Sequence, residues 1–407
     1  MNKIFTRIII AIVVLAASQL SFAASSNIEW GSRLIEQILI HPEVVAARET
    51  MNASLSLADG LERPIYNPVL GGEIEREGEA NNFRVGISQT FDWTNKQSVR
   101  QKQAVYSREA ARQYYEVVLQ QKLSEVLELL VEWESARAIA ELALNQESQL
   151  DTLLDLFVER QESGDLGQVD VELAFLSLSQ RLNFSAQALA ELRGTEARLL
   201  ELLPGWTAER MFIPEGFWLS DSPAQSSLWL DEHPLVMLAK ADWEALQQVA
   251  EFTSRAIRPD PSFGINAGEA NQENVISLSF SLPLNIRNNY NAEARSADQT
   301  ALAAEAEYRA VRRQQEFSIQ SAQNTLQEYQ IRFERWKNLM QGREESSEEL
   351  LTAQWDSGDI STTEYLLALQ QRTEGLMAGI ELQKYYEMAK INWLFQTGLI
   401  INGLEQL

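Results

Sequence analysis

The sequence predicts a mainly α-helical protein that also contributes a few β-strands to a membrane β-barrel. Three observations predict this fold class: a tandem internal repeat, a long proline-free tract in each half, and an alternating apolar stretch before each tract. The proline-free tracts predict long coiled-coil hairpins. The alternating stretches predict two β-hairpins, one in each half of the chain.

The first 23 residues have the pattern of a secretory signal peptide. Lys3 and Arg7 precede an apolar run from Ile8 to Ala17, and Ser21-Phe22-Ala23 forms a small-x-small cleavage site. The run is too short to cross a bilayer as a helix. We therefore expect residues 1–23 to be removed on export, with a retained N-terminal anchor as the alternative. A lipid anchor is excluded, because the chain has no cysteine.

The chain is strongly acidic, with 34 basic and 58 acidic side chains. Removing the signal peptide, which holds two basic and no acidic residues, leaves a net charge of −26. Nucleic-acid binding requires a cationic face, so this class of function is excluded. The negative charge either favours cations in an internal passage or only keeps a large surface soluble. Without cysteine there is no disulfide framework, so packing alone must hold the fold.

An internal duplication follows from landmarks that recur at an offset of 190–194 residues. His41-Pro42 returns as His233-Pro234. Three longer stretches also return in the same order: 78–81 as 268–271, 85–93 as 276–284 and 162–174 as 356–368. We expect a first repeat at residues 24–203, an inter-repeat linker at 204–232 and a second repeat at 233–407. Proline, glycine and serine from Gly194 to Glu232 predict that this region is irregular.

The helical tracts are defined by where proline is absent. All ten prolines lie outside residues 69–203 and 284–407, and each would destabilise a helix interior by roughly 3 kcal/mol. From Thr94 to Arg160, apolar residues recur at spacings of three and four, which predicts a coiled-coil helix about 100 Å long. Ala292–Arg343 has the same character. The predicted core positions are Leu119, Leu123, Val126, Leu130, Trp133, Ala140, Leu144, Leu154 and Val158, then Ala301, Ala304, Tyr308, Val311, Phe317, Ile319 and Leu326.

Before each long tract the apolar period changes to two. The predicted strands are centred on Phe83, Val85, Ile87 and Phe91 and on Ile276, Leu278, Phe280 and Leu282, with weaker partners at Leu70, Gly72 and Ile74 and at Phe263, Ile265 and Ala267. The connectors Glu77–Asn82 and Gly268–Asn274 have hairpin-loop composition. Four strands cannot close a barrel, and an open sheet edge is not tolerated in lipid, so several chains must contribute. The alternative is two hairpins that pack on helices in the periplasm.

The sequence offers little material for an active site. It has no cysteine and only two histidines, His41 and His233, each of which precedes a proline at an expected helix start. Neither a phosphate-binding glycine loop nor a zinc-ligand spacing is present. We therefore expect a protein that is not an enzyme, with no catalytic residue, no cofactor and no metal site.

Together, the signal peptide, the duplicated halves, the hairpin before each long helix and a Gly-Asp turn resemble the TolC-like outer-membrane efflux protein family. The resemblance covers essentially the whole mature chain. It implies that three protomers each give four strands to one twelve-stranded barrel in the outer membrane of a Gram-negative bacterium. It also implies that their helices form a tunnel through the periplasm. Asn67-Pro68, the stretch Ser88–Trp93 and Lys96 look most similar to the subgroup that serves heavy-metal cation exporters.

The turn is the most specific part of the resemblance. The family has a glycine followed about six residues later by an acid, which corresponds to Gly164 with Asp170 and to Gly358 with Glu364; Asp165 and Asp359 lie next to the glycines. The resemblance implies that these six residues form the periplasmic tip, with the gate and the adaptor-docking surface. A reversal between helices favours a residue that tolerates positive φ. Acids at the start of the returning helix interact favourably with the positive end of its dipole. This chain departs from the family pattern at Ser163 and Ser357, where an apolar residue is usual. It also departs at Leu367, where some members carry a second acid.

The implied function is passive export of small solutes, with heavy-metal cations as one class. The implied partners are a homotrimer, a periplasmic adaptor protein, an inner-membrane transporter of the resistance–nodulation–division type and outer-membrane lipid. Two alternatives remain open. One is the outer-membrane duct of a type I protein secretion system, and the other is a periplasmic coiled-coil adaptor or scaffold without a barrel. The sequence does not identify the transported substrate.

Overall fold

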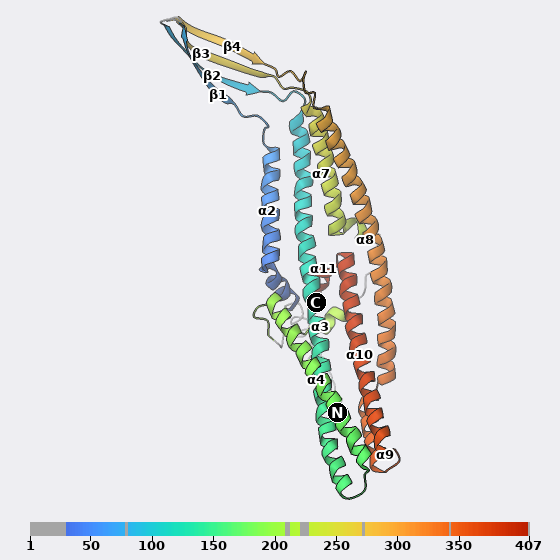
Figure 1. The fold of residues 1–407 in the computed structure, drawn as a ribbon. Helices are drawn as coiled ribbons and strands as arrows, with labels where there is room; N and C mark the ends of the chain where they lie inside the picture. Colours follow the sequence, from blue (N-terminus) through green and yellow to red (C-terminus); the bar gives the residue numbers. More distant parts are fainter. Residues whose placement is uncertain are drawn as a thin grey trace, which may run out of the picture. The chain divides into compact units, whose positions relative to one another are not determined.

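The computed structural model describes residues 30–77, 80–207, 212–219, 228–270, 273–341 and 343–405. The predicted signal peptide, residues 1–23, lies outside the described residues, as do the tips of both β-hairpins. The described elements follow the predicted order twice. Each half has a helix, a β-hairpin, a long helix and a helix that returns after a tight turn (Figure 1).

In the first half, residues 30–39 are helical and α2 (Pro42–Glu62) follows. The strands β1 (Val69–Glu77) and β2 (Ala80–Thr90) precede α3 (Lys96–Glu162), a single helix of 67 residues, and α4 (Gln168–Leu202) returns. In the second half, the corresponding elements are α7 (Pro234–Ala256), β3 (Ser262–Ala270), β4 (Glu273–Ser281), α8 (Asn291–Met340), α9 (Glu344–Asp356) and α10 (Thr362–Thr397). The short helices are α5 (Glu215–Leu219), α6 (Leu228–Glu232) and α11 (Ile400–Glu405).

The chain divides into two compact units, each of which takes segments from both halves. One unit contains Val45–Val118 and Ser227–Glu316, with the sheet and the helix segments that adjoin it. The other contains Met1–Val44, Leu119–Ser226 and Phe317–Leu407, with both helical turns. The repeat boundaries at residues 203 and 233 stay a prediction.

In the sheet-containing unit, the four strands form one antiparallel sheet in the order β1-β2-β3-β4. The two hairpins are joined through β2 and β3, where Ile87 lies opposite Ile265. The predicted connectors are wrong in extent. Glu77 pairs with Ala80 and Ala270 pairs with Glu273, so most of the residues expected in loops continue the ladder. Strand residues therefore extend into the stretches that were predicted as loops.

Both histidines begin helices, as predicted. His233 is the N-cap of α7, and its Nδ1 accepts a hydrogen bond from the Leu235 backbone N–H at 3.2 Å. His41 precedes α2, and its Nδ1 accepts from the Glu43 N–H at 3.4 Å. Proline at the next position suits the first helical turn, because the backbone N–H that it lacks has no partner there.

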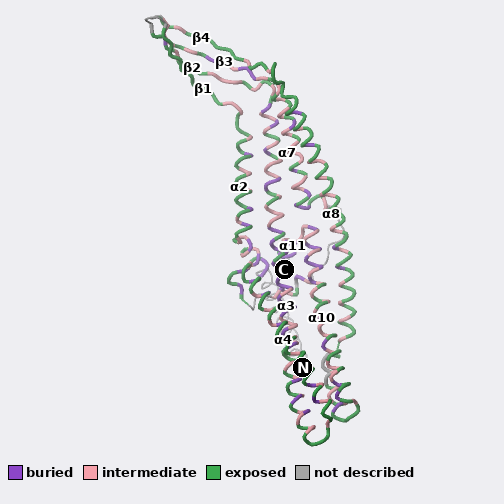
Figure 2. Tube along the Cα trace, viewed as in Figure 1, coloured by how far each residue is buried: buried purple, intermediate pink, exposed green. Residues whose placement is uncertain are grey.

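The unit that contains the turns has the larger apolar core. Leu34, Leu123, Leu130 and Ile391 are fully buried there, and the buried residues of α10 are densest toward its C-terminal end, near α11 (Figure 2). The prediction that Gly194–Glu232 is irregular is wrong in part. Residues 194–202 continue α4, and Phe217 of α5 is fully buried, so this region is partly a component of the core.

Most predicted seam positions of α3 are buried, but Leu144 is 43% exposed. Besides the predicted Ala140, the buried positions around it are Ala143, Leu150 and Phe157. A straight helix with 3.6 residues per turn drifts from a seven-residue repeat, so a seam extrapolated along the sequence leaves the buried face. In α8, Phe317 is also wrong as a core position, with 62% of its surface exposed. Among the described residues, no helix is both long enough and apolar enough to cross a bilayer.

Candidate functional site

The first candidate site is the apolar face of the four-stranded sheet. Residues opposite each other in an antiparallel ladder share one face, so the register places Leu70, Ile87, Ile265 and Leu278 in one row. A second row holds Gly72, Val85, Ala267 and Ile276. Ile74 and Leu278 are 87% and 82% exposed, and no helix of the same unit covers this face (Figure 1). A contiguous exposed apolar face of this kind marks a contact with a partner or with lipid.

The opposite face of the sheet consists mainly of small and polar residues near its helical end. One row holds Ser88, Gly264 and Ser279 with Val69 at its β1 end, and the next holds Gly71, Gly86, Asn266 and Ser277. Two glycines here are sterically required. A Cβ on Gly268 would lie 1.9 Å from the Phe83 carbonyl oxygen, and a Cβ on Gly86 would lie 2.7 Å from the Ile265 carbonyl oxygen. The sheet is therefore apolar on one face and mostly small or polar on the other, and, unlike in a sheet that packs on a soluble core, its apolar face is exposed.

The outer strands of this sheet are unpaired on one side. The sheet order leaves β1 and β4 with free edges among the described residues. An unpaired row of backbone N–H and C=O groups is a template for another strand. The sheet can therefore extend in both directions by adding strands from other chains.

The second candidate site is a pair of equivalent helical turns. Gly164 and Gly358 have φ angles of 85° and 78°, which confirms the predicted positive φ. After α3, the Gly164 N–H donates to the Gln161 carbonyl at 3.0 Å and the Asp165 N–H to the Arg160 carbonyl at 2.9 Å. This pair of bonds is a Schellman motif, which satisfies carbonyls at the end of a helix.

The turn after α9 repeats the pattern 194 residues later. The Gly358 N–H donates to the Trp355 carbonyl at 3.0 Å, and the Asp359 N–H donates to the Gln354 carbonyl at 2.9 Å. The serines that depart from the family pattern also have a structural role. Ser163 Oγ donates to the Glu159 carbonyl at 2.9 Å, and Ser357 Oγ donates to the Gln354 carbonyl at 3.0 Å. A hydroxyl thus adds a capping bond where an apolar residue would not.

The predicted acids begin the returning helices. Asp170 lies in the first turn of α4. Glu364 lies in the first turn of α10 and forms a capping box with Ser361, in which each side chain bonds to the other residue's backbone N–H. These hydrogen bonds lower the pKa of Glu364. Among the described residues, no cation lies within ion-pair distance of Asp165, Asp170, Asp359 or Glu364, so no ion pair there balances the charge of any of the four carboxylates.

The two turns are joined by an aromatic cluster that sequence analysis missed. Trp355 packs 5.2 Å from Phe157 and stacks 5.3 Å from Tyr365, measured between ring centroids. The Arg160 guanidinium lies 4.2 Å from the Trp355 ring centroid and 3.1 Å from Asp356 Oδ1. Leu154, Val171 and Ala174 complete the buried cluster. The predicted tip residues are thus held on two hairpins that pack together within one unit.

A buried ion pair lies in the sheet-containing unit, where the strands meet the helices. Lys96 Nζ lies 2.8 Å from Asp260 Oδ2, with side-chain exposures of 5% and 2%. The Tyr66 hydroxyl donates to the same oxygen at 2.6 Å, and burial with this hydrogen bond raises the pKa of Tyr66 to about 12. The carboxylate of Asp92 accepts from the backbone N–H groups of Lys96 and Gln97 and so caps α3. Lys96 stands out in the sequence, but its partner lies 164 residues away along the chain.

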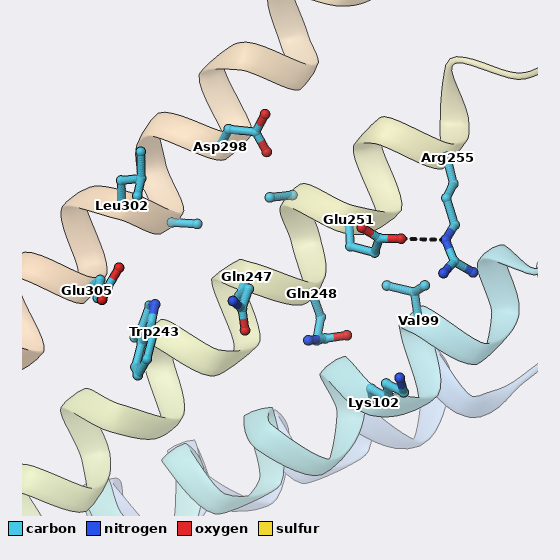
Figure 3. A pocket seen from close by; sticks show the side chains of 12 residues that line it. Val99, Lys102, Trp243, Gln247, Gln248, Glu251, Arg255, Asp298, Leu302 and Glu305 are labelled. Atoms are coloured by element: carbon cyan, nitrogen blue, oxygen red, sulfur yellow. Dashed lines mark hydrogen bonds and ion pairs between the residues drawn. The ribbon is translucent and has the colours of Figure 1, made fainter.

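A cleft of about 580 Å³ lies among α3, α7 and α8 of the same unit (Figure 3). Trp243 lies at one end, and Glu251 pairs with Arg255 at 2.7 Å toward the other. The residues that line the cleft include no histidine, serine, threonine or tyrosine, and its charged residues are Lys102, Glu251, Arg255, Asp298 and Glu305. No cluster of three or more metal-binding side chains occurs among the described residues.

No protein-family model matches the sequence. A search of curated proteins also gives no match. The comparisons that follow are therefore likenesses between three-dimensional structures.

Similar solved structures cover nearly the whole chain. The outer-membrane channel OprN matches with a TM-score of 0.75 at 15% identity, over 92% of each chain. CmeC, an outer-membrane channel of Campylobacter jejuni, matches with 0.73 at 13% identity, over 91% of this chain and 86% of that one. MtrE, an outer-membrane channel of Neisseria gonorrhoeae solved in an open state, matches with 0.71 at 12% identity, over 90% and 88%. At these identities the likeness shows the fold: long helices with a small sheet, arranged as in these channels.

Proposed function

We propose that this chain is one protomer of a trimeric channel in the outer membrane of a Gram-negative bacterium. The observation that carries the proposal is the four-stranded sheet, which exposes an apolar face and has two unpaired edges. In lipid, an apolar outer face lowers the free energy, whereas unpaired edges are costly unless the sheet closes. Pairing β4 of each protomer with β1 of the next leaves no unpaired edge and keeps the apolar face toward lipid.

Three copies are the number that the family resemblance implies, with twelve strands in one barrel. The likeness to solved outer-membrane channels over nine-tenths of the chain supports the same architecture. In this arrangement the apolar rows that contain Leu70 and Ile276 face lipid, and the rows that contain Ser88 and Gly86 face the lumen. The small lumen-facing side chains leave the passage wide.

The helices continue the passage into the periplasm and end at the two glycine turns. We place the gate and the adaptor-docking surface at Gly164, Asp165 and Asp170 of the first turn and at Gly358, Asp359 and Glu364 of the second. The four acids of each protomer have no ion-pair partner among the described residues, so in a trimer they would line the narrow end with negative charge. A periplasmic adaptor would contact the same tips.

The channel is a passive conduit in this proposal, since no bond is made or broken. The energy for export would come from an inner-membrane transporter of the resistance–nodulation–division type, coupled through the adaptor. Small solutes are the proposed cargo. Heavy-metal cations are favoured within this class by the sequence resemblance of residues 88–93 and Lys96, and by the net negative charge.

Membrane fractionation tests the proposal against a scaffold without a barrel. We expect the protein to remain in the outer-membrane fraction after a carbonate wash and to require detergent for extraction, because its sheet is embedded in lipid. The purified protein should have the mass of three chains plus detergent. A water-soluble monomer that needs no detergent would remove the channel and leave the periplasmic scaffold.

Single-channel recording tests the tip assignment. We expect neutralisation of all four acids to asparagine or glutamine to lower the cation preference and change the conductance. Replacing Glu201, an exposed acid near the far end of α4, with glutamine provides a matched control. If the fourfold variant conducts like the wild type, the gate is elsewhere.

The transported material separates efflux from protein secretion. A deletion strain with greater sensitivity to metals, dyes or detergents supports small-solute export. A strain that resists these compounds normally but no longer secretes a protein substrate supports a type I secretion duct. Genes for a transporter and an adaptor beside this gene would identify the partners.

A further inference from the structure

The apolar face of the sheet ends in an aromatic band where the strands meet the helices. Phe263 and Phe280 lie opposite each other in the β3–β4 ladder, on the same face as the apolar rows. The Phe263 ring centroid lies 5.2 Å from that of Phe280 and 5.8 Å from that of Phe91. The Phe91 N–H donates to the Pro261 carbonyl at 2.9 Å, which ties the band to the segment after α7. All three rings are more than half exposed, as is Trp93.

Three arginines lie in the segments that join this band to the helices. Arg63 follows α2, Arg258 follows α7 and Arg287 precedes α8. Each is exposed, and its side chain has no hydrogen bond or ion pair within the part of the chain that the structure describes. Both Arg63 and Arg258 are followed by proline, at equivalent places in the two halves of the chain. The three guanidinium groups are therefore available to a partner.

Hydrogen bonds between these segments bring the three arginines to one level of the unit. The Tyr66 hydroxyl donates to Asp260 Oδ2 at 2.6 Å, which joins the segment after α2 to the segment after α7. The Asn285 side chain donates to the Ile257 carbonyl at 2.6 Å, which joins the segment before α8 to the same place. Each arginine lies within three residues of one of these contacts along the chain. The arginines therefore lie together beside the aromatic band.

The acids that adjoin these segments do not neutralise the arginines. Asp260 forms the buried ion pair, Asp92 accepts from the first N–H groups of α3, and Glu62 pairs with an arginine of that helix. Glu293 is exposed at the start of α8, where Arg295 offsets its charge. A chain with a net charge of −24 thus presents a local excess of positive charge at the end of its apolar sheet.

We propose that this junction docks the headgroups of anionic phospholipids in the leaflet that faces the helices. The guanidinium groups bind the phosphates, for which their planar fork of donors is suited. The aromatic band lies at the boundary between headgroups and acyl chains, where aromatic girdles occur in membrane barrels. The inference rests on the proposed function, because only a sheet embedded in lipid brings this end to a headgroup layer. It adds a lipid preference that a closed barrel alone does not require.

Quenching of tryptophan fluorescence by brominated lipid tests the proposal on the full-length protein in vesicles. The vesicles contain phosphatidylcholine or phosphatidylglycerol with bromine on the acyl chains near the headgroup. The signal of Trp93, two residues after Phe91, is the difference between the wild type and Trp93→Phe. We expect phosphatidylglycerol to bind beside Trp93 more tightly than phosphatidylcholine. Each arginine should contribute about fivefold to this preference, which should weaken as the salt concentration rises.

The triple variant Arg63→Gln, Arg258→Gln and Arg287→Gln should lose the preference for phosphatidylglycerol. A matched triple variant loses the same charge from exposed, unpaired positions on helices of the same unit and should keep the preference. Its substitutions are Lys102→Gln, Arg112→Gln and Arg313→Gln.

Equal binding of the two lipids by the wild type would overturn the lipid preference and leave the barrel intact. The same conclusion would follow if the junction variant kept the preference, or if the matched variant lost it to the same extent. No quenching of Trp93 by either lipid would contradict both this inference and the membrane insertion on which the proposed function depends.

Discussion

Gly164 and Gly358 lie 194 residues apart, and each ends a helix with the same left-handed backbone conformation, with φ of 85° and 78°. Each is followed by an aspartate whose N–H bonds to a carbonyl five residues earlier. Nothing lies within 4 Å of a Cβ built on either glycine. The requirement for glycine therefore comes from the backbone alone.

Replacing Gly164 or Gly358 with alanine should destabilise the tip by about 1 kcal/mol per site, because a side chain in the left-handed region is strained. Gly194 is the matched control. It lies inside α4 and also has open space around its Cβ, so Gly194→Ala should be neutral or stabilising by about 0.5 kcal/mol. The rate of limited proteolysis at the turns would measure the difference. Equal rates for the three variants would show that the turns are not constrained.

The requirement at Gly379 is steric instead. A Cβ there would lie 1.9 Å from Trp336 Cζ2, whereas Gly375 on the same helix has nothing within 4 Å. Gly379→Ala should displace the indole and cost about 1–3 kcal/mol. Gly375→Ala should be neutral or slightly stabilising. Thermal midpoints and tryptophan emission report both effects, and an unshifted midpoint for Gly379→Ala would contradict the packing of α8 on α10.

The buried pair of Lys96 and Asp260 makes a prediction for Tyr66. Burial, and then the hydrogen bond to Asp260, raises the pKa of Tyr66 from 10.0 to about 12. The stabilisation that Tyr66 provides is complete below pH 10, because its hydroxyl is then protonated in both the folded and the unfolded chain. It is lost as the pH rises through 12, since the tyrosine ionises at lower pH in the unfolded chain. Absorbance of tyrosinate should show a component that titrates near pH 12, which Tyr66→Phe removes and Asp260→Asn moves to lower pH. No change in either variant would refute the contact.

Glu387 of α10 predicts a pH effect near neutrality. Its side chain is 7% exposed, and burial raises its pKa from 4.5 to about 7. The buried site favours the protonated carboxyl over the charged one. Glu387 therefore contributes to stability below pH 4.5, and this contribution is lost as the pH rises through 7. Glu387→Gln should therefore stabilise the protein at pH 8, by up to about 3 kcal/mol, and change little at pH 5. A pH-independent difference in midpoint would contradict this burial.

The parts of the fold that the sequence predicted depend on local signals. The His-Pro helix starts, the positive φ of the glycine turns and the acids at the starts of α4 and α10 each need only a few consecutive residues. The long helices follow from the absence of proline over more than a hundred residues.

The parts that were missed depend on contacts between distant residues. Trp355 meets Phe157 only after both hairpins have packed, and Lys96 finds Asp260 across 164 residues. Hairpin loops are shorter than composition indicated, because the ladder keeps polar residues such as Asn274 in register. The exposure of Phe317 similarly reflects which helix lies opposite it, which periodicity does not specify.

The central claim is that β4 of one protomer pairs with β1 of the next, and cysteine cross-linking tests it most directly. The chain has no cysteine of its own. Variants would combine Gly71→Cys in β1 with Ser277→Cys, Ser279→Cys or Ser281→Cys in β4, all on the small-residue face. Within one protomer the two strands are three spacings apart, about 14 Å, which exceeds the roughly 7 Å limit between disulfide-bonded Cα atoms. We predict a covalent trimer under non-reducing, denaturing conditions for at least one pair and none for the single variants. Monomers alone from every pair in membranes would contradict the closed barrel.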